Sequence, residues 1–113
     1  MDKEKRGLRF AFDASAEIAP ESSPTAFVPA RATELSLQGC FLETAAEFEM
    51  NGHVLVKIFE SGEFFEAKAS VLYIRSSGVG LAFREVKPHF RAVLQKWILK
   101  ALDNQVDARQ TPR

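Results

Sequence analysis

The spacing of hydrophobic residues changes period once along the chain, and this change constrains the fold more than any other feature. Up to residue 83, short segments alternate apolar and polar side chains, as strands with one buried face do. From Pro88 onward, apolar residues recur every three or four positions, which is typical of an amphipathic helix. The sequence therefore predicts a β-rich domain that ends in one helix.

Turn signals divide the β-rich part into about six segments, and strands at this spacing favour an antiparallel barrel or sandwich. We expect strands at residues 9–18, 25–33, 40–43, 53–59, 64–74 and 79–83. Asn51-Gly52 is a strong turn signal between two of them. Pro29 lies inside the second segment and predicts an edge position or a bulge there, because proline cannot donate to a strand ladder. The predicted fold class is an all-β-dominated, six-stranded antiparallel barrel with one C-terminal amphipathic α-helix.

The helix is expected from Pro88 to about Asp103, and Trp97 lies on its apolar stripe. A tryptophan in that position should be buried against the barrel or a partner. Residues 1–8 are predicted to form a flexible basic arm, residues 9–103 the barrel with its helix, and residues 104–113 a disordered polar tail.

Charge and cysteine content narrow the class of protein. The 113 residues carry 15 basic and 15 acidic side chains, so no net charge attracts DNA or an acidic membrane. No apolar run approaches the ~20 residues that cross a bilayer, and the charged N-terminus argues against a signal peptide. Cys40 is the only cysteine, which fits a reducing cytoplasm. We expect a cytoplasmic protein that binds neither DNA nor membrane.

Catalytic constellations are missing from the sequence. His53 and His89 have no neighbours at metal-ligand spacing, and both are predicted to be surface residues. Cys40 follows Gly39 in an apolar segment and is predicted to be a small buried residue, not a nucleophile. We therefore expect no enzyme activity, no metal and no cofactor.

Two polar segments could form a binding site. Lys5, Arg6 and Arg9 surround Gly7, and a guanidinium can hold a phosphate, pair with the edge of guanine or stack on a base. Taken alone, this segment is better explained as a solvated basic end. Glu34, Ser36 and Gly39 form the second segment, which offers a carboxylate, a hydroxyl and a glycine. Taken alone, it is a polar strand end with a turn.

Together the two segments resemble the motifs of the PilZ domain family. Lys5 and Arg9 have the spacing of the family's RxxxR motif, with Arg6 beside them. Glu34, Ser36 and Gly39 have the spacing of its [D/N]xSxxG motif. The segment 78–83, GVGLAF, is similar to the end of the family's final hairpin, and the resemblance covers about residues 5–103. Lys5 replaces the first arginine of the family pattern and Glu34 replaces its Asp or Asn.

The resemblance implies a cyclic di-GMP receptor in bacterial signalling, with no other cofactor. It implies that Lys5, Arg6 and Arg9 hold phosphates and guanine edges, and that the basic arm becomes ordered over the barrel when ligand binds. Glu34 and Ser36 would then read a guanine, and Gly39 would permit close approach. The alternative is a PilZ-like adaptor that binds a protein effector through its barrel or helix surface and ignores nucleotide. A third alternative, a weak RNA-binding barrel, has less support because no basic and aromatic stripe is present.

Overall fold

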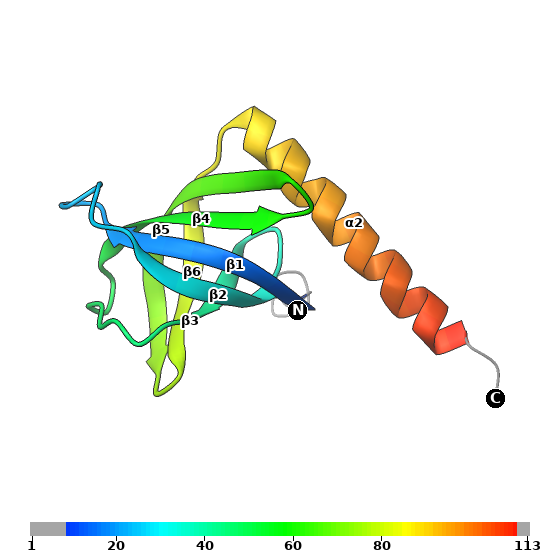
Figure 1. Ribbon diagram of the computed structural model, residues 1–113, viewed down its shortest axis with the longest axis horizontal. Helices are drawn as coiled ribbons and strands as arrows, with labels where there is room; N and C mark the ends of the chain where they lie inside the picture. Colours follow the sequence, from blue (N-terminus) through cyan, green and yellow to red (C-terminus); the bar gives the residue numbers. More distant parts are fainter. Residues whose placement is uncertain (1–8, 111–113) are drawn as a thin grey trace, which may run out of the picture.

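The computed structural model describes residues 9–110, with side chains described through residue 103. Six strands precede one helix in this part of the chain. They are β1 (Phe10–Pro20), β2 (Val28–Leu35), β3 (Gly39–Glu43), β4 (His53–Glu60), β5 (Glu63–Arg75), β6 (Gly78–Glu85) and the helix α2 (Pro88–Gln110). The strands close into a barrel in the order β1-β2-β3-β6-β5-β4, and every neighbouring pair is antiparallel (Figure 1). The predicted fold class is confirmed.

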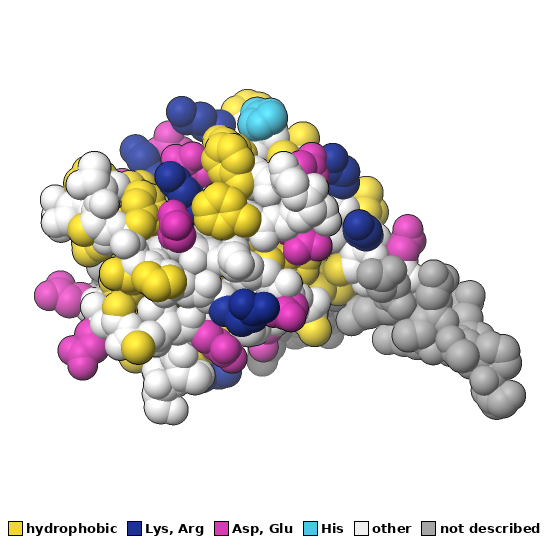
Figure 2. Space-filling model, in the orientation of Figure 1, with side chains coloured by type: hydrophobic (Ala, Val, Ile, Leu, Met, Phe, Trp, Pro, Cys, Tyr) yellow, Lys and Arg dark blue, Asp and Glu magenta, His cyan; other side chains and the backbone are white. Residues whose placement is uncertain are grey.

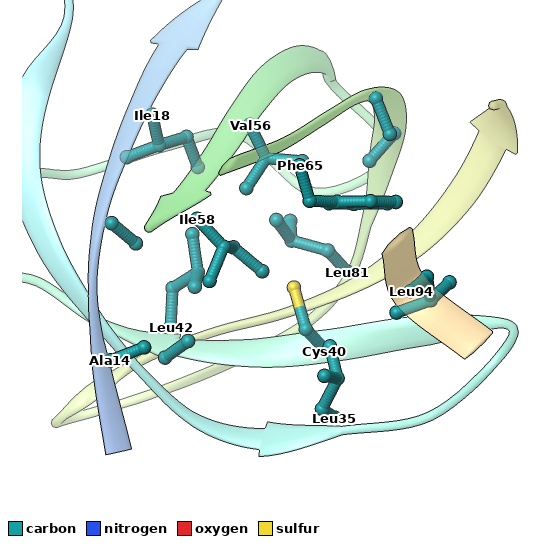
Figure 3. Close-up of a cluster of buried hydrophobic side chains, with 14 of the residues drawn as sticks. Ala14, Ile18, Leu35, Cys40, Leu42, Val56, Ile58, Phe65, Leu81 and Leu94 are labelled. Atoms are coloured by element: carbon teal, nitrogen blue, oxygen red, sulfur yellow. The ribbon is translucent and has the colours of Figure 1, made fainter. Parts of the chain in front are cut away.

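The barrel core follows from alternation along the strands. On β4, Val54, Val56 and Ile58 are buried, while the residues between them are only partly covered. Figure 3 shows that side chains from all six strands and from α2 converge on the barrel interior. Cys40 is among them as a buried free thiol, as the sequence predicted.

Tight turns set the register of the hairpins. Ser61 and Gly62 both have positive φ, at 55° and 77°, between β4 and β5. Two such residues form the type of turn whose twist matches paired strands. Pro29 pairs with Glu17 of β1 but lies beyond the last β2–β3 pair, Arg31 with Glu43. Pro29 therefore has a strand neighbour on one side only, as an edge residue does, and the bulge of β2 lies elsewhere, between Ala32 and Glu34.

Helix α2 packs against β5 and β1 through its first half, and Figure 1 shows its second half leading away from the barrel. Trp97 is buried as predicted, with 3% of its surface exposed. Its ring lies 5.8 Å from that of Phe12 on β1 and 6.4 Å from that of Phe65 on β5. Within the described residues, no helix is sufficiently long and apolar to span a membrane.

The prediction that the helix ends near Asp103 and is followed by a disordered tail from residue 104 was wrong for residues 104–110. The helix continues to Gln110. The apolar stripe stops at Leu102, but no glycine or proline interrupts the chain beyond it until Pro112. A proline disfavours helical backbone at the residue before it, so the sequence permits helix as far as Gln110.

Candidate functional site

Register brings the second polar segment to a row of residues that crosses five strands. Ala11 on β1 pairs with Glu34 on β2, and Glu34 pairs with Phe41 on β3. Phe41 pairs with Gly80 on β6, which in turn pairs with Tyr73 on β5. We call these five residues the cross-barrel row. Glu34 and Tyr73, which are far apart in sequence, thus belong to one stretch of the barrel wall.

Arg9, just before β1, forms hydrogen bonds with two residues of this row. Its Nη1 donates a hydrogen bond to Oε1 of Glu34 at 3.0 Å and one to the hydroxyl of Tyr73 at 3.4 Å. The side chains of Arg9 and Glu34 are 49% and 39% exposed, so the pair lies open to solvent. The hydrogen bond to Glu34, with the neighbouring Tyr73, raises the pKa of Arg9 above its ordinary value. The guanidinium is therefore charged and partnered by a carboxylate.

Ser36 builds the turn between β2 and β3 and is buried. Its hydroxyl accepts hydrogen bonds from the backbone N–H of Gln38 at 3.2 Å and of Gly39 at 3.1 Å, and it donates one to the carbonyl of Gly39 at 3.2 Å. One donor and two acceptor positions are all that a hydroxyl has. In this structure Ser36 therefore holds the turn that follows Glu34, and its hydroxyl has no capacity left for another partner.

Gly39 is required by the barrel itself. A Cβ at this position would collide with the backbone carbonyl oxygen of Leu81 on the adjacent strand β6. The absence of a side chain thus allows β3 and β6 to approach each other. This packing reason differs from the close ligand approach that the resemblance implied for Gly39.

Tyr73 is a residue of this site that the sequence did not reveal. A Cβ at Gly80 would collide with the Tyr73 ring, so the ring lies directly over the glycine. The ring also stacks on Phe41, with centroids 6.1 Å apart and planes at 18°. The GVGLAF segment contained a signal for this arrangement, because a strand glycine often marks a close approach. Only the strand register, however, shows that Tyr73 makes it.

The structure brings four of the six predicted site residues together and does not describe the other two. Arg9 and Glu34 are brought together, and Ser36 and Gly39 form the adjoining turn. Lys5 and Arg6, with the rest of the predicted basic arm, lie outside the described residues.

The other titratable candidates take no part in this site. Cys40 is buried in the core next to Phe41, and burial raises the pKa of its thiol to about 12, so it is a neutral core residue. His53 and His89 are both exposed, as predicted, and His53 lies 3.5 Å from a carboxylate oxygen of Glu21. In residues 9–103 no three His, Cys, Asp or Glu side chains are grouped to hold a metal ion.

Comparison with known proteins agrees with the motif spacing and the barrel. The PilZ domain family model matches residues 3–100. The chain belongs to the PilZ domain family. No curated protein matches its sequence. The fold is shared with solved PilZ domains of low identity.

Three solved structures illustrate this likeness. The PilZ domain of CeSA from a cellulose-synthesizing bacterium has a TM-score of 0.67 at 13% identity, covering 82% of this chain and 96% of that one. The PilZ domain of Escherichia coli YcgR with c-di-GMP has a TM-score of 0.68 at 16% identity, covering 93% and 96%. The Bacillus subtilis inhibitor of motility MotI/DgrA has a TM-score of 0.73 at 17% identity, covering 91% of this chain but 52% of that one.

Proposed function

We propose that this PilZ domain is a receptor for cyclic di-GMP that acts in bacterial second-messenger signalling. The observation that carries the proposal is the meeting of Arg9 and Glu34. These residues belong to two motif segments 25 positions apart, and they lie in direct contact on an exposed part of the barrel wall. The solved YcgR domain that shares this fold contains c-di-GMP, which supports the same ligand here.

The chemistry of the contact suits a guanine nucleotide with phosphates. A guanidinium binds a phosphate through two parallel hydrogen bonds, and a carboxylate accepts the N–H groups on the edge of guanine. Arg9 would therefore hold a phosphate and Glu34 a guanine. Ser36 and Gly39 would act indirectly, because they hold the turn that sets the position of Glu34. Lys5 and Arg6 would supply further cations from the arm.

In the free protein, Arg9 and Glu34 are each other's partners, so ligand must exchange one contact for two. An exposed ion pair contributes only about 0–1 kcal/mol to stability. A hydrogen bond to a charged group contributes about 1.5–3 kcal/mol. The exchange therefore favours a ligand that offers both a phosphate to Arg9 and a guanine edge to Glu34.

Calorimetric titration of the full chain with cyclic di-GMP tests the proposal, and GMP is the matched control. GMP presents the same base and a phosphate but lacks the second nucleotide. We expect saturable heat with cyclic di-GMP and much weaker binding of GMP. If cyclic di-GMP gives no heat at high micromolar concentration, the receptor function is wrong. In the proposed role the protein is a cytoplasmic binding module and not an enzyme, and its single thiol stays reduced.

The adaptor function is the second candidate, and an exposed aromatic cluster favours it. Phe59 and Phe64 flank the β4–β5 turn and are 38% and 43% exposed. Their ring centroids lie 6.2 Å apart. Phe90 on α2 continues the cluster, with its ring centroid 5.3 Å from that of Phe64. Figure 2 shows basic and acidic groups interspersed with hydrophobic side chains on this view of the surface. Aromatic residues with a polar rim are enriched at protein interfaces, so a chain that failed the titration would be assigned this function.

A further inference from the structure

Arg75 lies over the aromatic part of the cross-barrel row. Its guanidinium carbon is 4.9 Å from the ring centroid of Tyr73 and 5.5 Å from that of Phe41. Both distances fall within the ~6 Å at which a cation is attracted to an aromatic face. The two ring planes differ by only 18° and their centroids are 6.1 Å apart, so Arg75 spans both rings. The three side chains form a layered group on the barrel wall, with the two rings as one layer and the guanidinium as the next.

This layered group is joined to the proposed ligand site through Tyr73. The Tyr73 hydroxyl accepts a hydrogen bond from Arg9, while the face of the same ring carries Arg75. The ring lies directly against the backbone of Gly80, because a Cβ there would overlap it. Two guanidinium groups, from the start of β1 and the end of β5, therefore contact a single tyrosine.

The charges of the two arginines differ in how they are balanced. Arg9 is paired with Glu34, so that contact is neutral as a whole. Arg75 is exposed, and within residues 9–103 no carboxylate oxygen lies within 4.0 Å of it. Among the described residues of this wall, Arg75 is the cation whose outer face and charge are both available to an anionic ligand.

We propose that the exposed face of Arg75 is the stacking plane for one purine base of the ligand. This inference rests on the proposed function and adds to it a residue outside both family motifs. A guanidinium is planar and stacks on bases as well as on aromatic rings. The base would lie on the outer face of Arg75, opposite the Phe41 and Tyr73 rings, and the ligand's phosphates would lie toward Arg9. A lysine could supply the charge of Arg75 but not its plane.

The alternative is a purely structural role, in which Arg75 covers two aromatic rings and is otherwise solvated. Long basic side chains commonly cover apolar surface in this way. Under that explanation, removing the guanidinium exposes Phe41 and Tyr73 but leaves affinity for nucleotide unchanged.

Titration of Arg75→Ala, Arg75→Lys and the control Arg91→Ala with cyclic di-GMP separates these explanations. Arg91 is an exposed arginine on α2, so its removal changes the net charge equally. Loss of one stacked base should weaken binding by about 5- to 150-fold in Arg75→Ala. Arg75→Lys should lose most of the same affinity, and Arg91→Ala should bind as the wild type does. Thermal melting of each variant establishes that it is folded.

Each outcome bears on a different claim. If the wild type binds and Arg75→Ala binds equally well, the stacking role is wrong while the receptor function stands. If Arg75→Lys retains wild-type affinity, Arg75 acts through charge alone and the stacking plane is refuted. If the wild type does not bind cyclic di-GMP, the proposed function fails and this inference fails with it.

Discussion

Two regions of the barrel share strand β5 but use it in opposite ways. Near one end of the strand, Phe65 packs against Trp97 of α2 in a buried apolar contact. Near the other end, Tyr73 meets Arg9 on an exposed polar wall. On the wall, Arg9 is hydrogen-bonded to Glu34 and Tyr73, whereas the buried indole N–H of Trp97 has no acceptor among the described residues. The helix contact is thus suited to stability, and the wall is suited to exchanging partners.

The largest expected effect is on the helix side. Trp97→Ala should lower the free energy of unfolding by about 3–5 kcal/mol, because it removes a large buried ring. Trp97→Phe is the matched control. It keeps an aromatic ring and removes a buried donor that lacks a partner, so its cost should be clearly smaller. Urea unfolding of both variants measures the difference, and a wild-type midpoint for Trp97→Ala would show that α2 does not stabilise the barrel.

On the wall, we expect a large effect on ligand binding and a small effect on stability. Arg9→Ala should weaken cyclic di-GMP binding by about 10- to 150-fold, the equivalent of about 1.5–3 kcal/mol for a charged hydrogen bond. Its stability should change by no more than about 1 kcal/mol, because the ion pair is exposed. Arg31→Ala is a suitable control, since Arg31 forms a similarly exposed pair with Asp13 at 2.6 Å. Equal affinities for Arg9→Ala and the wild type would place the ligand elsewhere.

Ser36 should affect both properties, because it is buried and yet borders the wall. Ser36→Ala leaves the N–H groups of Gln38 and Gly39 without their acceptor, which should cost about 1–3 kcal/mol of stability. Binding should fall less than in Arg9→Ala, by about 2- to 10-fold, because Ser36 acts only through the turn that positions Glu34. Denaturation and calorimetry on the same preparation test this. A loss of affinity with unchanged stability would mean that Ser36 contacts ligand directly.

Cys40 and Phe41 are neighbours on β3, and Cys40 belongs to the core. Burial raises the pKa of Cys40 to about 12, whereas the pKa of a thiol in the unfolded chain is about 8.5. The thiol's stabilising contribution is therefore complete below about pH 8.5 and is lost as pH rises toward 12, by up to about 1.4 kcal/mol per pH unit. Unfolding measured from pH 8 to pH 11 should show this slope, and Cys40→Ala should lack it. Parallel profiles would contradict the assignment.

The smallest expected change comes from restoring the family's residue at position 34. Glu34→Asp shortens the side chain, which should break the 3.0 Å contact with Arg9 and free the guanidinium for phosphate. Because an exposed pair contributes about 0.2–1 kcal/mol, affinity should stay equal or rise by up to about fivefold. Calorimetry measures this, and Glu34→Gln, which keeps the length without the charge, is the control. A large loss of affinity in Glu34→Asp would show that the longer side chain is needed.

Much of the fold could be predicted because its signals are local. The turn at Asn51 and the Ser61–Gly62 hairpin follow from residues that tolerate positive φ, and the buried face of β4 follows from alternation. The pairing of Arg9 with Glu34 could be expected only through the family motifs. The end of α2 was misplaced because an apolar stripe records where a helix packs, whereas its length depends on where helix formers stop.

The sequence alone determined the strands, the helix, the burial of Trp97 and the motif spacing, because each depends on neighbours within a few positions of the chain. Tertiary structure decided which strands pair and in what register. This strand pairing brings Arg9 to Tyr73, 64 positions away in the sequence, and places Arg75 over Phe41 and Tyr73. It also showed that Ser36 and Gly39 are needed by the barrel itself. Such contacts depend on strand register, and a shift of one residue would turn every side chain to the opposite face.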